Sequence, residues 1–87
     1  MAAVQIPSLM RDLTAGQAQV TVPGRTLRQV IEALEETYPG IEGRLCEAGR
    51  LKPEIMVSVD NRVARLGLAQ PVNECSEIRF LPHVSGG

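Results

Sequence analysis

A single amphipathic helix near the middle of the sequence most constrains how this chain folds. Thr26 suits the N-cap position, and Gln29 follows it at the three-residue spacing of a capping box. The Pro39-Gly40 pair then ends the helix. One apolar stripe at helical spacing is formed by Leu27, Val30, Ile31, Leu34 and Tyr38. Glu32, Glu35 and Glu36 lie off this stripe, so we expect them to be solvated. A helix with one apolar stripe needs another layer against which to bury it.

Alternating polarity on both sides of the helix predicts the strands of that layer. The predicted strands are residues 2–6, 18–22, 54–60, 62–66 and 77–82. A glycine-containing turn over 13–17 joins the first two strands into a hairpin, and Asp60-Asn61 turns the third. The side chains expected to face inward are Val4, Ile6, Val20, Val22, Ile55, Val57, Val59, Ile78 and Phe80. Arg79 and Leu81 then face outward.

The remaining segments carry weaker patterns. Residues 40–45 ("GIEGRL") favour a short helical turn, and 47–53 ("EAGRLKP") favour a loop. A second loop over 67–76 turns Leu68 and Val72 inward. The element order predicts an α+β fold of the β-grasp, or ubiquitin-like, type: a mixed sheet of four to five strands with one main helix on one face. We expect one domain over 1–82 and a flexible, extended tail over 83–87.

Composition agrees with a small soluble domain and excludes some functions. The 87 residues are 44% hydrophobic and 22% charged, with a formal net charge of −1. Tyr38 and Phe80 are the only aromatic residues, so Val, Ile and Leu must build the core. Without a basic surplus or aromatic platforms, nucleic acid is not an expected partner. The first residues do not match a signal peptide and no apolar run is long enough for a membrane span, which favours a cytoplasmic protein without a membrane partner.

The sequence lacks the usual patterns of a self-contained active site. Cys46 and Cys75 are far apart without a partner motif, which favours two reduced thiols. One histidine, His83, gives no Cys/His metal site, and a solvated residue is a simpler interpretation of it than a general base. The segment "GRLCEAGR" (43–50) has the wrong spacing for a phosphate-binding loop, and Arg50 stands where that loop needs lysine.

The end of the sequence, "FLPHVSGG", suggests chemistry at the C-terminus itself. Pro82 lacks an N–H and ends strand pairing, and the five residues after it reach on the order of 17 Å when extended. Gly86 and Gly87 have no Cβ, so they can thread a channel too narrow for side chains. They also leave the terminal carboxylate open to a nucleotide phosphorus. The alternative is a passive terminus of small residues.

Four segments in order resemble the ThiS/MoaD family of ubiquitin-like sulfur carriers. They are "IPSLMRDLTAGQ", "VPGRTLRQVIEALEETYPGI", "GRLKPEIMVSVDN" and "EIRFLPHVSGG". The region "GRLCEAGRLKP" resembles the small subunit of molybdopterin synthase and the carriers that feed cysteine or thiocarboxylate biosynthesis. The opening segment is more similar to the cysteine-pathway carriers.

The resemblance implies a carrier and co-substrate rather than an enzyme. An E1-like enzyme would use ATP and Mg²⁺, which this chain does not itself bind, to adenylate Gly87, and a sulfur donor would displace AMP to leave a thiocarboxylate. Gly86 would thread beside Gly87. Partner contacts are implied for Leu81 and Arg11, and for the segment that leads to the glycines: Pro82, His83, Val84 and Ser85. The sulfur would pass to an acceptor synthase, either cysteine-synthase-like or the large subunit of molybdopterin synthase.

The sequence departs from the family pattern at two places, and it is also compatible with two other functions. "NECSE" (73–77) replaces a common Asp-Gly-Asp, so that turn is expected to differ, and His83 replaces a smaller residue or proline. The same acyl-adenylate would serve a ubiquitin-like modifier joined to lysines through Gly87. A non-covalent β-grasp interaction domain would use no tail chemistry.

Overall fold

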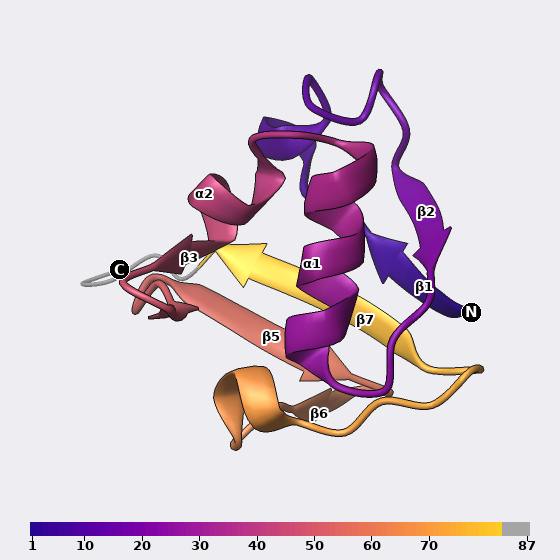
Figure 1. Ribbon diagram of the computed structural model, residues 1–87, viewed down its shortest axis with the longest axis vertical. Coiled ribbons are helices and arrows are strands. Elements are labelled where there is room, and N and C mark those ends of the chain that lie inside the picture. The colour runs from indigo at the N-terminus through magenta and orange to yellow at the C-terminus, as the bar shows by residue number, and fades with distance from the viewer. Residues whose placement is uncertain (83–87) are drawn as a thin grey trace.

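A five-stranded mixed sheet with one long helix across it forms the body of the protein (Figure 1). The computed structural model describes residues 1–82, so the predictions for residues 83–87 lie outside the described residues. The strands of the sheet, in the spatial order β2-β1-β7-β5-β6, are β1 (Ala2–Gln5), β2 (Gln19–Val22), β5 (Ile55–Val59), β6 (Arg62–Val63) and β7 (Glu77–Pro82). The predicted β-grasp arrangement is confirmed.

The last strand, β7, lies at the centre of the sheet. It pairs parallel with β1, where Val4 lies opposite Ile78, and antiparallel with β5, where Val57 lies opposite Phe80. These four side chains are at most 3% exposed, because they face the helix on the inner side of the sheet. The inward positions predicted from alternation are buried as expected except for Ile55, which is half-buried.

Helix α1 (Leu27–Thr37) is capped almost as the sequence predicts. The Thr26 hydroxyl accepts a hydrogen bond from the backbone N–H of Gln29 at 3.3 Å. The Gln29 side chain accepts from the N–H of Arg25 at 2.8 Å, one residue before the N–H used in a capping box. The apolar stripe is buried, apart from a half-buried Tyr38.

The connection from β1 to β2 is longer than the predicted turn over 13–17. It contains a 3-10 turn, η1 (Ser8–Met10), and runs on through residues 11–18. Met10 is 5% exposed and Thr14 is fully buried, and the Thr14 hydroxyl donates to the carbonyl of Gln17 at 2.9 Å. The antiparallel pairing of the two strands is confirmed, but the loop between them has packed side chains of its own.

A second correction concerns residues 47–53, for which the sequence pattern predicts a loop. The predicted helical turn is present as α2 (Ile41–Leu45), and it leads into a small hairpin of β3 (Cys46–Glu47) and β4 (Arg50–Leu51). Ala48 and Gly49 both have positive φ, 54° and 77°, as a two-residue type I′ turn requires. Ala-Gly is a weak signal for this turn, which explains why the pattern did not indicate a hairpin.

Two smaller differences follow β5. The predicted strand over 62–66 ends at Val63, and the predicted loop over 67–76 begins with a 3-10 turn, η2 (Gly67–Ala69). Val72 is buried and Leu68 half-buried, as the sequence indicates.

Gly24 is the position where the fold most clearly requires a missing side chain. A Cβ there would lie 2.7 Å from the Val30 Cγ2 and 2.8 Å from the backbone nitrogen of Val30. That nitrogen is fixed in the first turn of α1, so it cannot move away cheaply. We predict that Gly24→Ala lowers the free energy of unfolding by about 1–3 kcal/mol, measured by urea denaturation.

Gly43→Ala is the matched control for this prediction. Gly43 lies in α2, and a Cβ added there would meet no atom within 4 Å. Alanine at this position is therefore expected to be neutral or stabilising by up to about 1 kcal/mol. Equal effects at both positions would contradict the packing explanation.

Candidate functional site

The outer face of the sheet carries exposed apolar side chains beside the start of the C-terminal tail. Met56 on β5 lies directly opposite Leu81 on β7, and they are 38% and 45% exposed. Val63 on β6, opposite Ser58, is 56% exposed. We call Met56, Val63 and Leu81 the outer patch. The outward position predicted for Leu81 is confirmed, whereas the sequence pattern did not identify Met56 and Val63 as site residues.

Polar pairs lie beside the outer patch on the sheet. Arg79, two residues before Leu81, pairs with Glu77 at 2.7 Å, and Gln5 donates to Gln19 at 2.8 Å. Such exposed pairs contribute little stability. Gln19, Gln5, Arg79 and Ser58 form a polar row across the sheet, which lies next to the Met56–Leu81 pair and ends at Val63 on β6.

The register of the central strands shows where along the sheet Arg11 is bonded. Gln5 pairs with Arg79 in the parallel ladder, so Ile6 lies about level with Phe80, in the second half of β7. The Arg11 Nε donates to the carbonyl of Ile6 at 3.1 Å, and the residue is exposed. Arg11 is thus an exposed cation bonded to the chain just after β1, the strand beside β7, and its contact with a partner stays a prediction.

The other predicted site residues lie at or beyond the end of the described chain. Pro82 is the last described residue, and its backbone pairs with Ile55. His83, Val84, Ser85, Gly86 and Gly87 lie outside the described residues. Their roles stay predictions.

The turn over 73–77, where the sequence departs from the pattern of the family it resembles, is held by Asp60. The Asp60 carboxylate accepts from the Ser76 hydroxyl at 3.0 Å and from the Glu77 N–H at 2.9 Å. Asn73 caps the turn by accepting from the Cys75 N–H at 3.0 Å. The start of β7 is therefore fixed to the β5–β6 turn, a long-range contact that no local sequence pattern could indicate.

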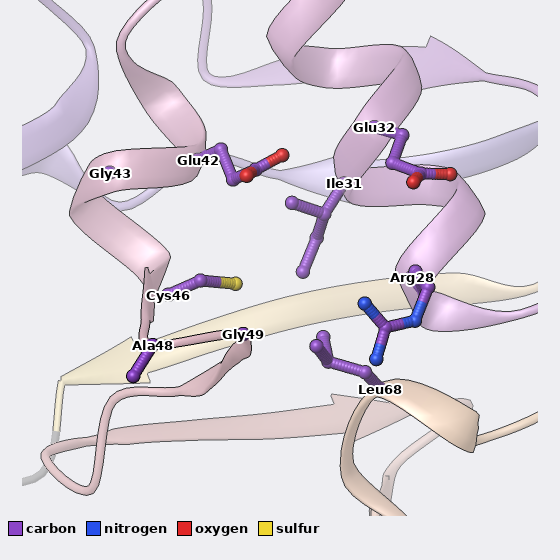
Figure 2. A pocket seen from close by; sticks show the side chains of 9 residues that line it. All are labelled: Arg28, Ile31, Glu32, Glu42, Gly43, Cys46, Ala48, Gly49 and Leu68. Carbon is purple, nitrogen blue, oxygen red and sulfur yellow. The ribbon is translucent and has the colours of Figure 1, made fainter.

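A hollow on the helix side of the molecule was not predicted. It lies between α1, α2, the β3–β4 hairpin and η2, and has a volume of about 170 Å³ (Figure 2). Cys46 points into it, and burial, together with the negative charge of Glu42, raises the pKa of the Cys46 thiol. A raised pKa keeps the thiol protonated and unreactive. Cys46 and Cys75 are both free thiols.

Glu35 corrects the expectation that all three helix carboxylates are simply solvated. Its carboxylate accepts from the backbone N–H groups of Glu42, at 2.9 Å, and Gly40, at 3.0 Å. These bonds cap the start of α2 and lower the pKa of Glu35 below its ordinary value of 4.5. Glu35 thus connects the end of α1 to the short helix that borders the hollow.

Residues 1–82 were also searched for a membrane-spanning helix and for a group of metal ligands. No helix in this part of the chain is long and apolar enough to cross a membrane. The same residues contain no group of three or more Asp, Glu, His or Cys side chains placed to hold a metal ion.

The five-stranded mixed sheet with one long helix across it is the fold of small ubiquitin-like, or β-grasp, proteins. The ThiS family model matches residues 4–87, so the chain belongs to the ThiS family. It is 36% identical to the sulfur carrier protein CysO of Mycobacterium tuberculosis in an alignment 89 residues long, gaps included, that covers 97% of this chain and 96% of the relative.

Two further comparisons bear on function. The structure superposes on a chain of the Amycolatopsis orientalis BexX/CysO complex with a TM-score of 0.94 and 31% identity, over the full length of both chains. Small archaeal modifier protein 3 of Haloferax volcanii is 36% identical over 64 residues, or 71% of this chain and 70% of the relative.

The Glu35 cap makes a pH-dependent contribution to stability. The folded pKa is lowered, so the contribution is complete above about pH 4.5 and is lost as the pH falls through the folded pKa. We predict that Glu35→Gln is less stable than the parent protein at pH 7, and that this difference shrinks progressively below pH 4.5. Urea denaturation at a series of pH values measures it. Glu36→Gln, an exposed neighbour on α1, is the control, and a constant difference for Glu35→Gln across the series would contradict the assignment.

Proposed function

We propose that this protein is a sulfur carrier whose Gly87 carboxylate is converted to a thiocarboxylate that donates sulfur in biosynthesis. Membership of the ThiS family supports this, together with the similarity to CysO carriers along nearly the whole chain. The observation that carries the proposal is the position of the outer patch. Met56 and Leu81 lie together at the end of β7, so a protein docked there could also hold the tail.

The proposed chemistry begins with activation of a poor electrophile. The Gly87 carboxylate attacks the α-phosphorus of ATP, forms an acyl-adenylate and releases pyrophosphate. Hydrosulfide then attacks the acyl carbon and expels AMP, which gives the thiocarboxylate directly. With a persulfide donor, the terminal sulfur attacks to form an acyl disulfide, and a second thiol cleaves its S–S bond, which releases the thiocarboxylate and leaves the donor as a disulfide. ATP and Mg²⁺ bind to the E1-like partner, so this chain acts as a co-substrate rather than an enzyme.

Partner recognition divides between the outer patch and the tail. The activating enzyme covers Met56 and Leu81, because apolar side chains at the centre of an interface contribute most to binding. Arg11 contacts the same enzyme at the edge. Pro82, His83, Val84 and Ser85 lead Gly86 and Gly87 into its active site. The acceptor is a synthase, either cysteine-synthase-like or like the large subunit of molybdopterin synthase. A solved complex that contains a CysO chain supports partner binding of this kind.

Protein modification is the second candidate. The 36% identity to small archaeal modifier protein 3 favours it, although the match covers 71% of this chain. Both functions share the acyl-adenylate and differ in the nucleophile, which is sulfur in one and a lysine amine in the other. Stable conjugates of higher mass would identify the modifier.

The direct test of the carrier chemistry is the intact mass of the protein after incubation with its E1-like enzyme, Mg-ATP and a sulfur donor. We predict an ATP-dependent exchange of one oxygen for sulfur, located in the terminal peptide. Gly87→Ala is expected to slow this exchange strongly, because a methyl group crowds the carboxylate. An unchanged mass after incubation with the cognate enzyme would contradict the proposal.

Docking at the outer patch gives a separate prediction. Leu81→Ser is expected to raise the KM of the activating enzyme for this protein about tenfold, with little change in protein stability. Leu66→Ser is the control, because Leu66 is also an exposed leucine, 62% accessible, but precedes η2 rather than lying in the outer patch. This variant should leave the KM unchanged. Equal KM values for the Leu81 variant and the parent protein would remove the outer patch from the interface.

A further inference from the structure

A groove on the helix side of the molecule has no part in the activation chemistry described above. Two adjoining hollows form it, and both are lined by Arg28, Gly49 and Leu68. Figure 2 shows the first hollow, with Arg28 reaching down from α1 toward Leu68 on η2. Arg50, Leu51 and Leu66 line the second hollow but not the first.

The two hollows of this groove differ in the charged residues that line them. The charged residues among the described lining of the second hollow are Arg28 and Arg50, both exposed. Within residues 1–82 neither forms an ion pair, in contrast to Arg79. Glu32 and Glu42 line the first hollow, away from η2 (Figure 2). The charged residues described in the lining of the second hollow are therefore both positive, which makes this hollow complementary to a carboxylate.

The second hollow also exposes apolar surface. Leu66 is 62% exposed, and Leu51 and Leu68 are half-buried beside it. A leucine with this exposure next to the two arginines matches a protein segment that carries both an acidic and an apolar side chain.

The groove lies on the other side of the sheet from the outer patch, and a short segment connects it to the strand that pairs with the end of β7. Leu51 lies four residues before Ile55, whose backbone pairs with Pro82. The chain between them is short and bonded locally, since the Ile55 N–H donates to the carbonyl of Lys52 at 2.9 Å. A protein seated in the groove would thus bind on the helix side of the sheet without covering Met56 or Leu81.

We propose that this groove is a second docking surface, which binds an acidic and apolar segment of the acceptor synthase. The inference rests on the proposed function, because it concerns the enzyme that removes the sulfur. A carrier that is charged on one protein and discharged on another exchanges partners at the same tail. A separate surface lets the acceptor recognise the carrier independently of the outer patch that holds the activating enzyme.

The experiment compares charge reversals inside and outside the groove. The variants are Arg28→Glu and Arg50→Glu, and Arg25→Glu is the control, since Arg25 is also exposed but lies outside the groove. Each thiocarboxylate is made by cleaving an intein fusion with sulfide, so its formation does not depend on activation. The probe is the source organism's synthase that accepts sulfur from the wild-type thiocarboxylate, and calorimetry gives its Kd for each variant at low and high salt.

Each groove reversal is expected to raise the Kd about tenfold at low salt and less at high salt, while Arg25→Glu changes it less than about twofold. The rate of activation by the E1-like enzyme should stay at the wild-type value. Wild-type affinity of the groove variants, an equal loss for Arg25→Glu, or a loss confined to activation would each overturn the proposal. Failure of the proposed function is recognised separately, because then no synthase takes sulfur even from the wild-type thiocarboxylate.

Discussion

The parallel pairing of β1 with β7 is the interaction on which the rest of the structure depends. It brings the first and last strands together at the centre of the sheet and fixes where the chain leaves the domain. Ile78 and Phe80 on β7 are 0% and 3% exposed, and burial of such a side chain contributes about 1.5–3 kcal/mol. The residues that precede the tail are therefore part of the core strand.

Alternation along β7 and β5 puts the side chains of the two faces of the sheet in different surroundings. Inward side chains such as Phe80 and Val57 hold α1, while outward Leu81 and Met56 lie next to each other in solvent. Binding energy for a partner on the outer face therefore comes from residues that the core does not use. The helix side offers a second surface of different chemistry, with arginines beside leucines. Two separate surfaces of this kind agree with the proposal that the protein binds one enzyme after another.

Much of this arrangement could be predicted from the sequence, because it rests on periodicity. The spacing of Leu27, Val30 and Ile31 indicates α1, and the alternation of Ile78 to Leu81 indicates β7 and its outward leucine. What could not be predicted depends on contacts between distant residues. Asp60 holds the turn before β7 from 16 residues away, and Met56 joins Leu81 only through strand register. The β3–β4 hairpin was missed because its Ala-Gly turn lacks a strong signal, and the groove that it borders was missed with it.

The chemical form of the terminal carboxylate in cells is the most direct evidence on whether this protein carries sulfur there. The protein would be purified from the source organism at neutral pH under non-reducing conditions, and its terminal peptide analysed by mass spectrometry. We expect a thiocarboxylate on Gly87 in part of the population and no lysine-linked conjugates. A terminal peptide found only as the plain carboxylate or joined to lysines of other proteins would contradict this expectation.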